Sequence, residues 1–150
     1  MKPGKIRPLA ICVFRYNRHI LAAEGYDQVR RQVFYRPLGG RIEFGETGAQ
    51  TVVRELREEI QAEVAGVRYL DTLENIFTYN GQAGHEIVLV YDGTLVDRSL
   101  YERATIEGRE DEAELLFVAR WLALDALRAP GAPPLYPAGL LQLLDRERDS

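Results

Sequence analysis

A glycine-flanked loop that runs directly into an acid-rich helix, residues 40–62, constrains this chain more than any other feature. Thr47 is a good N-cap residue, and Gln50 three positions later completes a capping-box pattern. Gly45, just before the cap, marks a break in regular structure. The sequence therefore predicts a loop that ends at Thr47 and a helix that begins directly after it.

The predicted helix carries two kinds of side chain on neighbouring faces. At about 100° per residue, one face collects the apolar residues, namely Ala49, Val53, Leu56 and Ile60. Glu55, Glu58 and Glu59 stand at i, i+3 and i+4 on an adjacent flank. Such acids are often a solvated helix face, and Arg54 is spaced to pair with Glu58. Hard divalent cations also prefer oxygen ligands, so a metal site is the competing interpretation.

Composition limits the class of protein. The 150 residues fit a single domain, residues 1–150, and the formal net charge of −4 disfavours a stable nucleic-acid partner. Cys12 is the only cysteine, which excludes an internal disulfide framework and a multi-cysteine zinc site. The apolar run around it, residues 9–14, is too short for a membrane span, and no membrane partner is expected. A cytoplasmic location is the prediction.

The rest of the chain predicts more strands than helices. Strands are expected over the following ranges: 8–15, 20–24, 41–44, 64–78, 86–96 and 115–122. Pro37–Gly40 is predicted as a turn, residues 80–84 as a hairpin loop, and residues 107–114 as a charged, exposed segment. A helical turn is expected over 124–128 and a helix after Pro137. Together these elements indicate an α/β sandwich with a mixed sheet.

The acidic helix and its loop carry a resemblance to a known family. Gly40 is followed after five residues by Glu46, and after seven more by Arg54-Glu55-Leu56-Arg57-Glu58-Glu59. This spacing resembles the box of the Nudix hydrolases, and within them the MutT-type enzymes. Gln61 departs from the box, which normally has glycine there and ends its helix on it. The resemblance implies an α/β/α sandwich with the catalytic helix after a glycine loop.

The same resemblance implies a reaction. Nudix enzymes use Mg²⁺, or Mn²⁺ in its place, to hydrolyse a diphosphate linkage in a nucleoside diphosphate derivative. By position, the metal ligands would be the carbonyl of Gly39 and the carboxylates of Glu55, Glu58 and Glu59. A cation lowers the pKa of bound water and neutralises charge that develops during phosphoryl transfer. Oxygen ligands that hold such a cation would therefore promote the reaction.

The catalytic roles also follow from the resemblance. Glu55 would bind or deprotonate a metal-held water, and Arg54 would orient Glu55 through an ion pair. Glu46 would support both the loop and Arg54. Outside the box, the family often recruits a base or metal ligand from a later strand, and Glu86 is the candidate.

Four residues are candidates for substrate contact. Arg36 and Arg41 belong to a basic cluster ahead of the helix, and arginine suits phosphate through its fork of donors. His85 follows the predicted hairpin loop, and Tyr79, like other strand aromatics, offers a ring to a base or sugar. Surface solvation or core packing is the competing interpretation for each.

Several functions remain open at this stage. The leading one is a Mg²⁺-dependent pyrophosphohydrolase, and the alternative is a non-catalytic Nudix-fold domain that binds or senses a nucleotide. A structural domain with an acidic helix is the third. Nucleoside triphosphates, dinucleoside polyphosphates and nucleotide sugars are all candidate substrates, because the fold and box do not fix the substrate. The lack of further cysteines disfavours the zinc-containing, NADH-cleaving branch, and a homodimer is plausible by resemblance.

Overall fold

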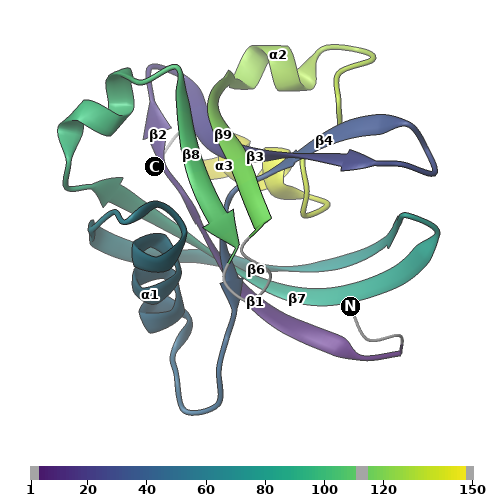
Figure 1. The fold of residues 1–150 in the computed structure, drawn as a ribbon, viewed down its shortest axis with the longest axis horizontal. Helices are drawn as coiled ribbons and strands as arrows, with labels where there is room; N and C mark the ends of the chain where they lie inside the picture. The colour runs from purple at the N-terminus through teal and green to yellow at the C-terminus, as the bar shows by residue number, and fades with distance from the viewer. Residues whose placement is uncertain (1–3, 111–114, 148–150) are drawn as a thin grey trace.

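A computed structural model describes residues 4–110 and 115–147, and two β-sheets make up most of it (Figure 1). The first sheet has the strand order β5-β1-β7-β6. Its strands are β1 (Ile6–Val13), β5 (Leu38–Arg41), β6 (Val64–Tyr79) and β7 (Gln82–Leu95). Strands β1 and β7 run parallel, whereas β5 and β6 pair antiparallel with their neighbours. The expected mixed sheet is therefore present.

The second sheet is antiparallel in the order β2-β3-β9-β8, with β4 paired to β3. Its strands are β2 (Arg15–Tyr16), β3 (His19–Asp27), β4 (Gln32–Arg36), β8 (Thr105–Glu110) and β9 (Leu115–Ala123). The helices are α1 (Gly48–Ile60), α2 (Leu124–Arg128) and α3 (Leu140–Glu147), with a 3₁₀ turn η1 (Arg98–Glu102). None of the described helices is long and apolar enough to cross a membrane.

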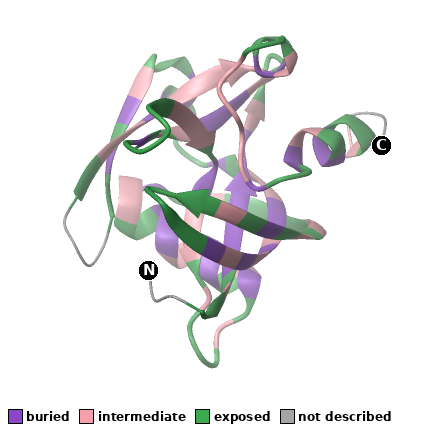
Figure 2. Ribbon diagram, turned by 90° about the vertical axis from the view of Figure 1, so that its right-hand side faces the viewer, coloured by how far each residue is buried: buried purple, intermediate pink, exposed green. Residues whose placement is uncertain are grey.

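Strand β1 explains the layering, because both of its faces are buried. Ala10 and Cys12 belong to the apolar cluster that includes Leu56 of α1. The alternate residues of the strand, Ile11 and Val13, belong to the cluster that includes α3. A strand covered on both faces has a near-continuous apolar sequence, as residues 9–14 do. Figure 2 shows these buried stretches on the central strands, and the result is an α/β/α sandwich.

Two predicted boundaries near the glycine loop are wrong. Leu38–Arg41, expected to lie largely within a turn, is strand β5, because Leu38 pairs with Cys12 and Arg41 with Leu9. Most of the short strand predicted over 41–44 is instead loop. The glycines hide this edge strand from a pattern search, since glycine is depleted in ordinary strands.

The predictions for two later segments, residues 80–84 and 107–114, are only partly confirmed. The hairpin loop is shorter than expected, because β6 ends at Tyr79 and β7 begins at Gln82. Asn80 and Gly81 have φ of 51° and 80°, the left-handed conformations of a two-residue type I′ turn. Of the charged segment 107–114, the part up to Glu110 belongs to β8. Residues 111–114 lie outside the described residues.

Candidate active site

Helix α1 has the caps that its sequence predicts. Thr47 Oγ1 accepts a hydrogen bond from the Gln50 N–H at 3.1 Å, and the Thr47 N–H donates to Gln50 Oε1 at 2.9 Å. At the other end, Gln61 adopts a left-handed conformation with φ of 56°. Its N–H donates to the Arg57 carbonyl, and the Ala62 N–H to the Leu56 carbonyl. The helix thus ends at the box position that normally holds glycine, although glutamine occupies it.

The buried face of α1 agrees with the predicted one in part. Leu56 is buried, and Ala49 and Ile60 pack against the same core cluster. Val53, also expected on the core side, instead lines an outer surface with the fully exposed Phe44. The face also extends to Val52, Thr51 and Glu55, which are buried. Apolar periodicity missed this extension because it includes a carboxylate and a hydroxyl, which a pattern search assigns to solvent.

Arg54 is the centre of a network of carboxylates. It binds Glu46 through two nitrogens, with Nε–Oε2 at 2.8 Å and Nη2–Oε1 at 2.9 Å. Its Nη1 lies 2.8 Å from Glu55 Oε1 and 3.3 Å from Glu58 Oε2. Thr51 Oγ1 donates to Glu46 at 2.6 Å. Hydrogen bonds from Arg54 and then Thr51 lower the pKa of Glu46 to about 2, so Glu46 is charged at neutral pH.

Both glycines of β5 are required, because other groups pack too closely against them to leave room for a side chain. A Cβ on Gly40 would lie 2.4 Å from the carboxyl carbon of Glu55. A Cβ on Gly39, whose φ is 154°, would lie 2.1 Å from the Ala10 carbonyl oxygen. Any side chain at these positions would therefore displace either the acid or strand β1. The glycines bring bare backbone to the carboxylates of α1.

Glu59 is a partly buried acid, and one of its two carboxylate oxygens is fully buried. Its Oε1 has no hydrogen-bond partner among the described residues. Burial, and then the negative charge of Glu55, raise its pKa to about 9, against the lowering effect of Arg36. A hydrogen bond from the Gly39 backbone also lowers it, which places Gly39 beside Glu59. Buried polar groups normally find partners, so an orphaned carboxylate oxygen marks a place for a ligand.

The donor chemistry at this place fits a hard divalent cation. Carboxylate and backbone carbonyl oxygens are the ligands that Mg²⁺ and Mn²⁺ prefer. Glu59 supplies the unpartnered oxygen, whereas Glu55 and Glu58 are held by Arg54. Within the described part of the chain, no three acidic, histidine or cysteine side chains form a ready cluster for a metal. The residues thus supply the type of ligand atom that the cation prefers, but they do not form a complete coordination shell.

Glu110 is a charged residue near the site that the sequence did not single out. Its charge contributes to the raised pKa of Glu59, and its Oε1 lies 3.4 Å from Arg36 Nη2. Arg36, a predicted substrate contact, therefore faces the same group of acids. Glu110 stands within a charged segment that was predicted only to be exposed, and no local pattern distinguishes it from its acidic neighbours.

Arg41 and Glu86 have surroundings that the sequence did not predict. The backbone carbonyl of Arg41 accepts from Arg54 Nη2 at 3.1 Å, whereas the residue itself is exposed. Glu86, expected near a strand start, lies inside β7 and is only 4% exposed. Its carboxylate pairs with Arg7 of β1 and accepts from Asn75 Nδ2 at 3.2 Å. Neither of these partners is among the hydrogen-bond partners of Arg54.

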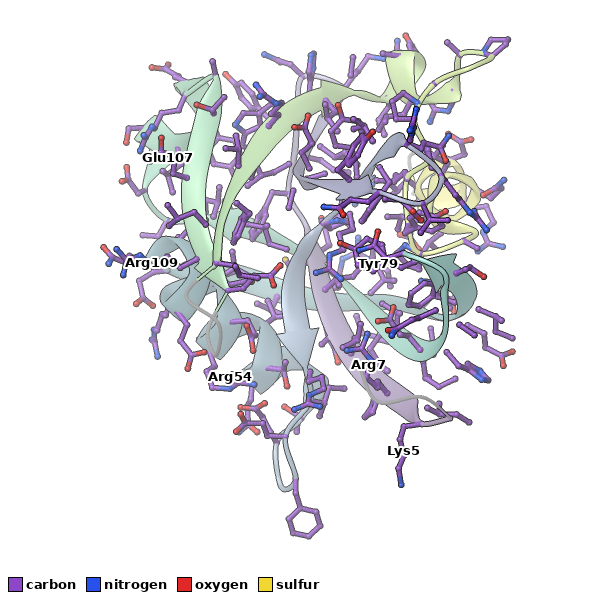
Figure 3. All side chains as sticks on the ribbon, turned by 45° about the vertical axis from the view of Figure 1, so that its right-hand side comes forward. Lys5, Arg7, Arg54, Tyr79, Glu107 and Arg109 are labelled. Carbon is purple, nitrogen blue, oxygen red and sulfur yellow. The ribbon has the colours of Figure 1, made fainter. Side chains whose placement is uncertain are left out.

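The other two candidates lie on the β6–β7 hairpin. His85 Nε2 is buried without a hydrogen-bond partner among the described residues. Tyr79 stands at the end of β6 and contacts Phe34 of β4 edge-on, with ring centres 5.6 Å apart. Figure 3 shows Arg54 at α1, and Arg7 and Tyr79 on the strand side of the molecule. The predicted residues therefore form one group around Arg54 and Glu59 and a second group on the hairpin.

Comparison with known proteins agrees with this architecture. The model of the NUDIX domain family matches residues 6–141. A MutT Nudix hydrolase from Burkholderia pseudomallei has a TM-score of 0.64 at 21% identity, over 94% of this chain and 98% of its own. A Nudix hydrolase from Nitrosomonas europaea has a TM-score of 0.65 at 17% identity, over 97% of this chain and 90% of its own. These structural likenesses concern the fold.

Sequence relatives agree as well. The NAD-capped RNA hydrolase NudC of Pseudomonas aeruginosa is 36% identical over 101 residues, which cover 67% of this chain and 29% of the relative. NudC of Pectobacterium carotovorum is 38% identical over 68 residues, 45% of this chain and 25% of the relative. The match thus spans less than a third of each of these curated relatives.

The fold, the glycine-flanked acidic helix and the family match define one class of protein. The chain belongs to the Nudix hydrolase family.

Proposed function

We propose that this protein hydrolyses a phosphoanhydride bond in a nucleoside diphosphate derivative, with a divalent cation as cofactor. The observation that carries the proposal is Glu59, whose buried oxygen has no partner in the described part of the chain and whose pKa is about 9. A fold that keeps such an uncompensated acid loses stability unless a ligand occupies the site. Mg²⁺ is the expected cation, with Mn²⁺ as a substitute.

Each residue of the site has a proposed task. Glu59 and Glu58, with the carbonyl of Gly39, would hold the cation, which when bound lowers the pKa of water and neutralises phosphate charge. Glu55 would receive the proton of the attacking water on its carboxylate. Arg54 orients Glu55, and Glu46 in turn fixes Arg54 through two hydrogen bonds.

Arg36 would bind a phosphate of the substrate. It is exposed, its Nη2 lies 3.4 Å from Glu110 Oε1, and its charge acts on Glu59. Its planar fork of donors suits phosphate oxygens. A bound cation would supply positive charge beside Glu110 and Glu59, and Arg36 would then be available to pair with a phosphate.

The names of the relatives and structural neighbours suggest a broad class of nucleotide substrates and no single one. Solved relatives include proteins named as an ADP compounds hydrolase and a UDP-X diphosphatase. The sequence relatives act on NAD-capped RNA by name. The single cysteine disfavoured an NADH-cleaving enzyme, but the shared sequence with these relatives keeps NAD-type dinucleotides among the substrates to test. A homodimer and a cytoplasmic location stay predictions.

A substrate screen tests the proposal. Purified protein is incubated with nucleoside triphosphates, dinucleoside polyphosphates, nucleotide sugars and NAD, each with Mg²⁺, Mn²⁺ or EDTA, and the products are separated by chromatography. Turnover that needs the cation and is lost in Glu55→Gln is the expected result. Glu63→Gln, which changes an exposed acid just past α1, is the matched control.

Two outcomes of this screen, combined with nucleotide binding and melting temperature measured on the same protein, would overturn the proposal. Nucleotide binding without turnover would support the alternative of a sensor domain. Neither turnover nor a cation-dependent rise in melting temperature would support a structural role for the acidic helix.

A further inference from the structure

The loop between β5 and α1 carries Glu46 on a segment without regular structure. Residues 42–47 belong to neither a strand nor a helix. Within this loop, Gly45 has φ of 86° and Phe44 is fully exposed. Figure 1 shows the loop that leads into α1 extending away from both sheets. A side chain on such a loop needs contact with a rigid element if it is to hold another group in place.

The ion pair between Glu46 and Arg54 does not supply that rigid contact by itself. Both of its hydrogen bonds, at 2.8 Å and 2.9 Å, join two long side chains to each other. They fix the orientation of the carboxylate relative to the guanidinium, but the two groups could still move together through the rotamers of both side chains. The Arg41 carbonyl, which accepts from Arg54 Nη2 at 3.1 Å, fixes only one end of the pair. Because Arg54 orients Glu55, movement of the pair would also displace the proposed base.

Thr51 connects this loop acid to the helix. Its Oγ1 donates to Glu46 Oε1 at 2.6 Å, and its backbone N–H donates to the Thr47 carbonyl at 3.0 Å. A hydroxyl that donates to a carboxylate makes one of the shorter and stronger hydrogen bonds. Thr51 has 0% exposure, so water does not compete for its hydroxyl. Glu46 is therefore attached to a buried position on α1.

The side chain of Thr51 is itself held in one orientation. A β-branched residue in a helix has few allowed χ1 rotamers. Thr51 Oγ1 also lies 3.1 Å from the carbonyl oxygen of Thr47, four residues earlier, which is a contact that selects between the rotamers of a helical threonine. The hydroxyl has one proton, and the shorter distance to the charged Glu46 oxygen assigns that proton to Glu46. Thr51 thus presents its donor to the loop from a fixed direction.

Glu46 Oε1 is the atom at which these contacts meet. It accepts hydrogen bonds from Thr51 Oγ1, from Arg54 Nη2 and, at 3.3 Å, from the Glu43 N–H. The first donor belongs to the buried side of the helix, the second to the group that is positioned, and the third to the loop. After Arg54, Thr51 has the largest effect in lowering the pKa of Glu46. Without the hydroxyl, this oxygen would be attached only to the loop and to a long side chain.

We propose that Thr51 is a positioning residue of the site, whose hydroxyl fixes Glu46 on α1 so that Arg54 holds Glu55 in place to accept a proton from water. This inference rests on the proposed function, in which Glu55 receives that proton. Thr51 contacts neither the cation nor the substrate in this role, and acts through Glu46 and Arg54. A displacement of about 1 Å in a reacting group is enough to slow a reaction severely, which gives such an anchor its effect on rate.

Two substitutions separate the hydroxyl of Thr51 from its packing. Thr51→Val keeps the β-branched shape and removes the donor, whereas Thr51→Ser keeps the donor and removes a methyl group. With the best substrate of the screen, Thr51→Val is expected to lower kcat by about fivefold to tenfold and to leave KM within about twofold, because the lost contact acts on the reacting geometry and not on binding. Thr51→Ser is expected to retain about half or more of the wild-type kcat, because the hydrogen bond remains.

A measurement without turnover tests the contact itself. The Nε–H of Arg54 donates to Glu46 Oε2, so its exchange with solvent is slow while the pair is held. Heteronuclear NMR of the metal-free protein is expected to show exchange about fivefold or more faster in Thr51→Val and unchanged in Thr51→Ser. Thr72→Val is the matched control, because Thr72 Oγ1 lies 2.7 Å from the Tyr69 hydroxyl on β6. It makes the same chemical change outside the site, and both kcat and the Arg54 exchange should stay at wild-type values.

The proposed hydrolysis and the role of Thr51 fail in different ways. Absence of turnover in the wild type would overturn the proposed hydrolysis. Wild-type exchange at Arg54 Nε in Thr51→Val would overturn the positioning role, whether or not the protein is active. An equal fall of kcat in Thr51→Val and Thr51→Ser would overturn it as well, since that pattern indicates lost packing and not a lost hydrogen bond.

Discussion

Two glutamates with buried carboxylate oxygens show how differently one residue type can be placed. Glu86 is 4% exposed and lies between Arg7 and Asn75, which compensate its charge and its hydrogen-bonding capacity. Glu59 is partly buried, its Oε1 has no hydrogen-bond partner among the described residues, and its pKa is about 9. We propose that this difference in partners separates a structural carboxylate, Glu86, from one kept for a ligand, Glu59.

The largest effect is expected from Glu59→Gln. Glutamine preserves the shape but cannot balance the charge of a cation, so turnover should fall by about 100-fold or more. Without metal, the variant should be at least as stable as the wild type, since it buries a neutral group. Steady-state kinetics and urea unfolding measure the two quantities. Near wild-type turnover would remove Glu59 from the site.

Glu86→Ala should have the opposite profile. It leaves Arg7 partly buried without its partner, which is expected to lower the free energy of unfolding by about 2–3 kcal/mol. The turnover of the folded fraction should change little. Glu86→Gln, which keeps an acceptor for Asn75, is the milder control, followed by urea denaturation and kinetics. A 100-fold loss of turnover in Glu86→Gln with intact stability would instead make Glu86 a catalytic residue.

The pH dependence of cation binding should show the raised pKa of Glu59. Its folded-state pKa of about 9 exceeds the ordinary glutamate value of 4.5, so without metal the folded protein retains a proton that the unfolded chain has lost. The free energy of unfolding should therefore fall as pH rises from about 4.5 to 9.

Binding of Mg²⁺ must release this proton, so its affinity should rise by up to about tenfold per pH unit below pH 9. Calorimetry in buffers of different ionisation enthalpy measures the released proton directly. Glu59→Gln should release none, and the same release from that variant would assign the proton to another group.

Gln61→Gly should give the smallest effect. Gln61 ends α1 in a left-handed conformation, with φ of 56°, that glycine adopts at lower cost. The variant should gain about 0.5–1 kcal/mol of stability, a rise of about 2–3 °C in melting temperature. Differential scanning calorimetry resolves such a shift. A lower melting temperature would show that the Gln61 side chain contributes a contact that outweighs its backbone strain.

The parts of the fold that depend on neighbours in sequence were predictable. The cap of α1, the long β6–β7 hairpin, β9 and α2 follow from turn residues, capping residues and periodicity. The family followed from fixed spacing between Gly40 and Glu59. These signals are local, because each one arises from residues that touch within a few positions of one another.

The parts that depend on distant contacts were not predictable. The β5 strand is stabilised by pairing with β1, and Glu110 gains its significance only where β8 passes near Glu59. The burial of Glu55 on α1 was missed for the same reason: Glu55 is buried because Gly40 leaves room for it and Arg54 pairs with it. These partners are too far apart in sequence for a local pattern to include them together.

The segment 134–138 has a consequence for the order in which the two sheets become connected. Its backbone is hydrogen-bonded to Tyr35 of β4 and to the side chain of Asn75 of β6. It follows every strand of both sheets in the chain. A growing chain therefore carries all its proposed catalytic acids before this connection between the sheets can form.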